Sequence, residues 1–283
     1  MFWRKFEERL FNLLIRVATL IIVGCLFIIV LTILVKGFPA MSWDMVSRIP
    51  SGGFYLGKEG GVLNAIIGSL YLGLGASIFS LVLSIPIVVY INIYSRSTSR
   101  FAQFIRISLD ILYGIPSIVY GAFGFVLMIA FGLKVSLLAG IITVGLLVLP
   151  IMARTMDEVI RTIPKELGDA SLSLGATKWE TAMKVIMRQA FPGVLTAILL
   201  GFGRAVGDAA SVIFTTGFTD NIPTSVLQPA ATLPLAIFFQ LGSPIKEVVD
   251  RAYASSLILT VIILIISISS RLLFKRFNKN VIK

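Results

Sequence analysis

The most informative segment of this sequence lies between two long apolar runs and reads Thr162-Ile-Pro-Lys-Glu-Leu-Gly-Asp-Ala-Ser-Leu-Ser-Leu-Gly-Ala-Thr-Lys-Trp-Glu180. Proline suits the first turn of a helix, so Pro164 predicts a helix that starts there and ends at Gly175, a natural left-handed stop. Thr177 and Glu180 have the spacing of a capping box, in which each residue satisfies a free backbone donor of the other. The segment therefore predicts two short helices joined by a glycine turn.

The apolar runs around this segment predict an all-α, polytopic membrane protein. Of the 283 residues, 57% are hydrophobic and 14% are charged, and the mean hydropathy is +0.96. A soluble domain has about 25% charged residues, whereas a membrane helix needs about 20 predominantly apolar residues. We expect six transmembrane helices, in residues 13–35, 62–94, 107–133, 136–153, 193–217 and 253–273.

The distribution of positive charge predicts how these helices are oriented. Eighteen Lys and Arg residues fall in the N-terminal segment, the second and fourth loops and the C-terminal tail, and six fall in the other loops. Because cytoplasmic loops carry an excess of Lys and Arg, both termini and the two short helices are expected in the cytoplasm.

Three parts of the chain follow from this topology. Residues 1–62 hold an N-terminal cytoplasmic segment, the first transmembrane helix and an external loop, and residues 276–283 form a basic cytoplasmic tail. Residues 63–275 form a core of five transmembrane helices, which includes the cytoplasmic loop 154–192. The apolar, proline-rich segment 219–251 is external, and short helices at the outer mouth or dipping into the membrane are expected there.

The residue types exclude several kinds of site. The sequence has no histidine and one cysteine, Cys25, so the commonest metal ligand and the usual base at neutral pH are missing. It also has no G-x-x-x-x-G-K-[ST] loop, the motif that cradles ATP phosphates. We therefore expect no metal site, no catalytic residue and no cofactor in this chain.

The fifth run contains charged side chains at a depth where they are costly. Arg204 lies about 18 Å beyond Pro192 along a helix, and Asp208, Ser211 and Thr215 follow it at helical steps. A charge near the bilayer centre costs at least about 2.5–3.5 kcal/mol, so it needs a partner or a water-filled path. Two interpretations stay open: an ion pair that specifies packing, or a pathway for an anion, which suits the planar donors of arginine.

The same run has small residues at every fourth position, a spacing that lets two helices approach closely. We assign to helix packing Gly193, Ala197, Gly201 and Ala205, which continue to Ala209 in this register, and in addition Gly207.

The hairpin segment resembles the cytoplasmic loop of importer permeases of the ABC superfamily. Their signature is EAA-x3-G-x9-I-x-L-P, and this chain has Asp169-Ala-Ser171, three residues, Gly175, nine residues and Val185-Ile-Met-Arg188. The spacing agrees, although Asp replaces the first Glu and Arg replaces the final Pro. From the residues alone, the hairpin either docks on a partner or lies on the membrane surface.

This resemblance implies a type I ABC importer permease (MetI-like) fold and a separate ATPase that binds the ATP. The hairpin 166–188 would sit in a cleft of that ATPase and transmit its closure to the transmembrane helices. The residues to which it implies this coupling role are Asp169, Ala170, Ser171, Gly175, Trp179 and Glu180.

A second resemblance is to the PstA-type permeases of phosphate importers, which carry an R-x-x-G-E segment where this chain has Arg204-Ala-Val-Gly207-Asp208. It extends to the segments 60–68, 114–121 and 228–234, and it covers most of the chain from about residue 60. It implies import of inorganic phosphate across a prokaryotic inner membrane, with Arg204, Asp208, Ser211 and Thr215 along the pathway. The implied partners are a PstC-like permease, two PstB-like ATPase subunits, an external PstS-like phosphate-binding protein and membrane lipid, with no nucleic acid.

Other functions remain as alternatives. A permease of a related oxyanion importer, for sulfate or molybdate, shares the docking loop, and the sister PstC-type subunit is close to the PstA type. An integral membrane enzyme would need a catalytic cluster that this sequence lacks. A channel would conduct without an ATPase and would leave the hairpin unexplained.

Overall fold

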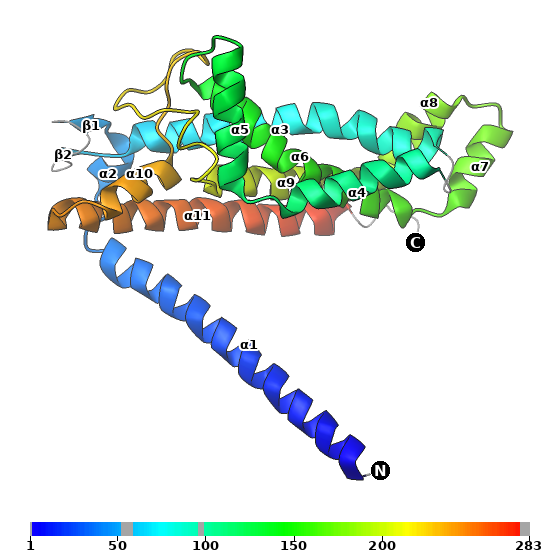
Figure 1. The fold of residues 1–283 in the computed structure, drawn as a ribbon, viewed down its shortest axis with the longest axis horizontal. Helices are drawn as coiled ribbons and strands as arrows, with labels where there is room; N and C mark the ends of the chain where they lie inside the picture. The colour runs from blue at the N-terminus through cyan, green and yellow to red at the C-terminus, as the bar shows by residue number, and fades with distance from the viewer. Residues whose placement is uncertain (1, 52–58, 96–98, 278–283) are drawn as a thin grey trace.

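The computed structural model of this chain describes residues 2–51, 59–95 and 99–277 (Figure 1). Its described helices are α1 (Phe2–Gly37), α2 (Trp43–Ser47), α3 (Leu63–Val89), the π-helix η1 (Tyr90–Tyr94), α4 (Arg100–Gly114), α5 (Ser117–Ala130), α6 (Leu137–Arg161), α7 (Lys165–Ser173), α8 (Lys178–Glu180), the π-helix η2 (Thr181–Ile186), α9 (Met187–Gly207), α10 (Leu233–Leu241) and α11 (Lys246–Phe277). The strands β1 (Pro50–Ser51) and β2 (Glu59–Gly60) pair antiparallel. The expected helical architecture is confirmed.

Four long helices, α3, α6, α9 and α11, run side by side along the long axis of the molecule (Figure 1). Their core is apolar and includes Leu72, Val148 and Met152, all of which are fully buried. Helix α1 diverges from this bundle and contacts α11 at its end, where Lys36 Nζ lies 4.8 Å from the centre of the Tyr253 ring. Its remaining apolar surface is therefore exposed in the isolated chain.

Within the described residues, five helical segments are long and apolar enough to cross a membrane: Glu7–Gly37, Leu63–Tyr94, Leu137–Arg161, Lys178–Gly207 and Lys246–Leu272. The expected span 107–133 is instead a bent pair, α4 and α5, with an angle of 102° between them. Pro116 has no backbone donor and forces the preceding residue out of the helical region, and Ile115 has φ −73° and ψ 131°. If this bent pair is one broken span, the described residues hold the six spans that the sequence predicts, with the third one bent.

The boundaries around α9 also differ from the prediction. Helix α9 ends at Gly207, so the expected span 193–217 is helical only in its first part. At the other end, Pro192 does not separate the cytoplasmic helix from the membrane helix, because α8, η2 and α9 form one continuous helical segment. A proline is tolerated within a membrane helix because neighbouring groups satisfy the freed carbonyl.

The small residues of α9 lie at two different contacts. A Cβ atom on Gly193 would lie 2.4 Å from Val159 of α6, and one on Gly201 would lie 2.8 Å from Val148 of the same helix. Ala197 and Ala205 are fully buried. Gly207, in contrast, faces Ile263 of α11 at 3.7 Å, so it does not share the contact with α6. Ala209 lies beyond the end of the helix.

We expect Gly193→Leu to destabilise the bundle, because the larger side chain must displace the stiff, branched Val159. Overpacking of this kind costs about 1–3 kcal/mol. Gly203→Leu is the matched control, since a Cβ atom there meets only Ile266 at 3.9 Å. Thermal unfolding of the two purified variants in detergent measures the difference. Equal unfolding temperatures would contradict the close approach of α9 and α6.

Candidate functional site

Arg204 and Asp208 form an ion pair at the end of α9. Arg204 Nη2 lies 3.6 Å from Asp208 Oδ1, and the Arg204 side chain is 50% exposed whereas that of Asp208 is 4% exposed. The guanidinium group is thus half open to its surroundings and its carboxylate partner is buried. An arginine in this state can offer its unused donors to an anion.

The other two polar residues of the expected stripe are not on the helix. Asp208 is the C-cap of α9, and its Oδ2 accepts hydrogen bonds from the backbone N–H of Ser211, at 2.8 Å, and from the Ser211 hydroxyl. Thr215 Oγ1 donates to the carbonyl oxygen of Ser211 at 3.3 Å. The aspartate side chain supplies a local turn that competes with helix continuation. The expected helical stripe is therefore wrong beyond Asp208, although the four residues remain neighbours.

Arg204 and Asp208 lie near the middle of the bundle's height. Gly201 packs against Val148 and Met152, which lie around the middle of α6. Thr216 lies against Gly140, near the end of α6 at which Leu137 lies. The ion pair lies between these two levels.

The non-helical segment after Asp208 is enclosed by protein. A Cβ atom on Gly121 of α5 would lie 2.9 Å from the carbonyl oxygens of Ala210 and Ser211, so α5 packs directly on this backbone. Ser136 donates its backbone N–H to Thr215 at 3.0 Å, and Ala230 donates its N–H to the Thr216 carbonyl at 3.0 Å. Irregular backbone at membrane depth occurs only where protein or a water-filled cavity satisfies its polar groups. An interrupted helix with a charged pair at its end can therefore form part of a pathway.

A second charged group lies at the cytoplasmic end of the bundle, and the sequence prediction missed it. Asp157 of α6 is fully buried and receives two hydrogen bonds from Arg106 of α4, at 2.9 and 3.1 Å. Asn92 of η1 donates a third at 2.7 Å. Arg154 lies 3.8 Å from Asp157 and also pairs with Asp110 at 3.3 Å. We call Asn92, Arg106, Arg154 and Asp157 the cytoplasmic ion cluster.

The cytoplasmic hairpin has the predicted local structure. Gly175 has φ +84°, and the capping box of Thr177 and Glu180 is present. The hydroxyl groups of Ser171 and Thr181 lie 3.0 Å apart and join the two arms. Exposed apolar side chains gather around the turn: Leu172, Leu174 and Trp179. A surface of this composition in water is expected to be covered by a partner.

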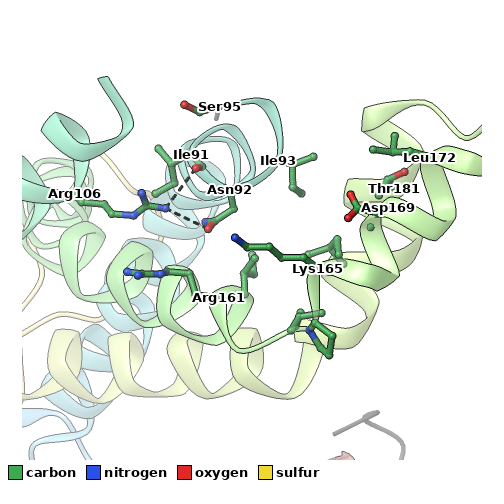
Figure 2. Close-up of a pocket in the computed structure, with 15 residues that line it drawn as sticks. Ile91, Asn92, Ile93, Ser95, Arg106, Arg161, Lys165, Asp169, Leu172 and Thr181 are labelled. Carbon is green, nitrogen blue, oxygen red and sulfur yellow. Dashed lines mark hydrogen bonds between the residues drawn. The ribbon is translucent and has the colours of Figure 1, made fainter. Parts of the chain in front are cut away.

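The remaining residues to which the resemblance implied a coupling role are also placed on this hairpin. Asp169 and Ala170 lie on α7 and are exposed, and Glu180 ends α8. A cavity of about 520 Å³ lies between this hairpin and the body of the protein (Figure 2). It adjoins the cytoplasmic ion cluster through Asn92 and Arg106.

Fold and site together define a membrane-embedded transport component with a helical hairpin at one end of its bundle. A family model described as "Binding-protein-dependent transport system inner membrane component" matches residues 53–283. The chain belongs to this family. It is therefore a multi-pass inner-membrane permease component and not an enzyme. Such a permease works with a separate ATPase and a substrate-binding protein.

The chain is similar to a curated relative along nearly its whole length. The phosphate transport system permease protein PstA of Haemophilus influenzae is 31% identical over 274 residues, which are 97% of this chain and 96% of the relative.

Two solved structures share the fold. An inward-facing MetNI methionine ABC transporter has a TM-score of 0.62 at 19% identity, over 76% of this chain and 95% of that chain. A bacterial alginate ABC transporter, in complex with its alginate-bound periplasmic protein, has a TM-score of 0.67 at 13% identity, over 99% of both chains. The expected MetI-like permease fold is confirmed.

Proposed function

We propose that this chain is the permease that lets inorganic phosphate cross the membrane, within an ATP-driven importer that works by alternating access. The observation that carries the proposal is the half-exposed guanidinium of Arg204 at mid-bundle, held beside the buried carboxylate of Asp208. Placing a permanent cation at this depth is unfavourable in free energy. Attraction to an anion that passes along the bundle would offset this free energy. The PstA relative supports phosphate as the anion.

Asp208 limits how tightly the site holds its anion. Its carboxylate is 3.6 Å from Arg204 and already satisfies part of the guanidinium charge. The carbonyl end of α9 adds further negative potential at the same place. An oxyanion would therefore meet attraction from Arg204 and repulsion from its surroundings, which suits a site that must release its substrate.

The partners follow from the same proposal. A second, PstC-like permease would cover the open side of Arg204, and an external PstS-like protein would deliver phosphate near residues 219–251. Two PstB-like subunits would bind ATP, and this chain would carry no cofactor. One of them would receive the hairpin 166–188, whose exposed Leu174 and Trp179 form an apolar contact surface.

Uptake of radiolabelled phosphate tests the proposal directly. In a strain that lacks its other phosphate importers, deletion of this subunit should abolish uptake, and the restored gene should return it. Competition with unlabelled phosphate, sulfate and molybdate identifies the anion. If sulfate or molybdate suppresses uptake as well as phosphate does, the related oxyanion importers become the better interpretation.

We expect Gly175→Val to weaken co-purification of the ATPase or to uncouple ATP hydrolysis from transport. A β-branched residue is strained at the φ of +84° that this turn requires. Gly175→Asn is the matched variant, because asparagine tolerates the left-handed region and should preserve coupling. Pull-down of the ATPase and the ratio of ATP hydrolysed to phosphate imported measure the effect. Normal coupling in the valine variant would show that ATPase docking does not depend on the conformation of the hairpin turn.

A further inference from the structure

The cavity on the cytoplasmic side has no role in the proposed pathway. It lies between α7 and η2 of the hairpin on one side and η1 and the end of α6 on the other, and its volume is about 520 Å³. Any molecule bound there would touch the hairpin and the body of the protein at once. A ligand in this cavity could therefore fix the position of the hairpin relative to the body of the protein.

Two cations that line this cavity form no ion pair within the part of the chain that the structure describes. Arg161, at the end of α6, and Lys165, at the start of α7, both line it. Neither has an ion-pair partner among the residues that the structure describes. Figure 2 shows the Lys165 side chain extending toward Asn92, and the Arg161 side chain extending away from the hairpin on the side of Arg106.

The other charged groups at the cavity leave an excess of positive charge. Arg106 lines the wall, but Asp157 already neutralises it through two hydrogen bonds. Asp169 is on the hairpin side and offers one carboxylate against the two unpaired cations. A small oxyanion is the ligand that this balance favours, because arginine and lysine both donate charge-assisted hydrogen bonds to it.

We propose that this cavity binds a phosphate group from the cytoplasmic side and that the bound group restrains the coupling hairpin. Arg161 belongs to the body and Lys165 to the hairpin, with Pro164 between their helices. A phosphate group held by both cations stabilises the present position of α7 relative to α6. The importer would thus be slowed when phosphate accumulates inside the cell, a regulation that rests on the proposed function.

Hydrogen exchange of the assembled permease–ATPase complex, without ATP, tests the binding itself. In phosphatidylcholine nanodiscs, millimolar inorganic phosphate should slow exchange in the segment 162–181 relative to chloride at equal ionic strength. Protection grows as 1 + [L]/Kd, so a phosphate concentration of twice Kd should slow hairpin opening about threefold. The double variant Arg161→Gln/Lys165→Gln should lose this protection.

The matched control removes two other cations from the second arm of the hairpin, in the variant Lys178→Gln/Lys184→Gln. Neither residue lines the cavity, so protection by phosphate should remain. Nanodiscs that contain phosphatidylglycerol distinguish the source of the group. Protection that appears with this lipid alone, and is lost in the Arg161/Lys165 variant, assigns the site to a lipid headgroup.

The proposal is overturned if phosphate and phosphatidylglycerol both leave the segment unprotected. It is equally overturned if the Arg161/Lys165 variant is protected as well as the wild type. Because exchange is measured without transport, failure here is distinct from failure of phosphate uptake, which would concern the proposed pathway.

Discussion

Replacing Arg204 by glutamine is expected to remove at least nine tenths of substrate uptake while the chain still assembles with its ATPase. Glutamine can fill the space and donate a hydrogen bond, but it removes the positive charge that faces the open side of α9. A hydrogen bond to a charged group contributes about 1.5–3 kcal/mol. Its loss while the anion passes Arg204 lowers transport about 10- to 150-fold. The initial rate of labelled phosphate uptake, with co-purification of the ATPase, measures this effect.

Two further variants separate charge from geometry at the same position. Arg204→Lys keeps the charge but loses the planar fork, so an intermediate rate is expected. Asp208→Asn keeps an acceptor for Ser211 but removes the counter-charge, so the anion should be held more tightly and released more slowly. Normal uptake in the Arg204→Gln variant would show that the ion pair is structural, although membership of the permease family would stand.

Several features could be predicted from the sequence because they depend on local patterns. Long uncharged runs can be satisfied in a bilayer only as helices, so the fold class followed from composition. The hairpin followed from residue chemistry at fixed spacing, and Gly175 with its φ of +84° and the Thr177–Glu180 capping box confirm it. The glycine and the capping-box residues each lie within a few residues of the turn or helix end that they specify.

The end of α9 could not be predicted from spacing alone. Arg204, Asp208, Ser211 and Thr215 fit helical steps, yet the helix ends after Gly207. The deciding interaction is the hydrogen bond from the Ser211 N–H to the Asp208 carboxylate. It joins residues three positions apart, which is also a spacing of neighbours on a helix, so the spacing does not distinguish the two structures. The pair Gly207-Asp208 was the sequence signal for a helix end. It was overlooked because the polar residues on either side fit a helical spacing.

The cytoplasmic ion cluster was missed for a different reason. Arg106 and Asn92 are 51 and 65 positions away from Asp157 in the sequence, and no local pattern links residues so far apart. The expected span 136–153 also ended too early, because α6 continues to Arg161 and carries Arg154 and Asp157 inside the fold. The charges of Arg154 and Asp157 led to the prediction of a loop, whereas in the structure both residues lie on α6 and form ion pairs.

Arg106→Met is expected to destabilise this chain by about 3–5 kcal/mol. It leaves Asp157 as a fully buried carboxylate whose two shortest ion-pair contacts are gone. Breaking a buried pair by removing one partner costs about 3–5 kcal/mol. Arg154 cannot replace the lost partner fully, because it is 3.8 Å from Asp157 and is also engaged with Asp110 and Glu158. The thermal unfolding temperature of the purified complex should fall accordingly.

Arg48→Met is the matched control for that variant. Arg48 pairs with Asp44 at 3.1 Å, but both side chains are mostly exposed, and exposed pairs contribute about 0–1 kcal/mol. A second test combines Arg106→Met with Asp157→Leu, since apolar replacement of both partners removes the uncompensated charge and should recover much of the lost stability. If Arg106→Met and Arg48→Met unfold at the same temperature, the Asp157 carboxylate reaches water in the folded complex. The cluster would then be open to water and would not hold α4 against α6.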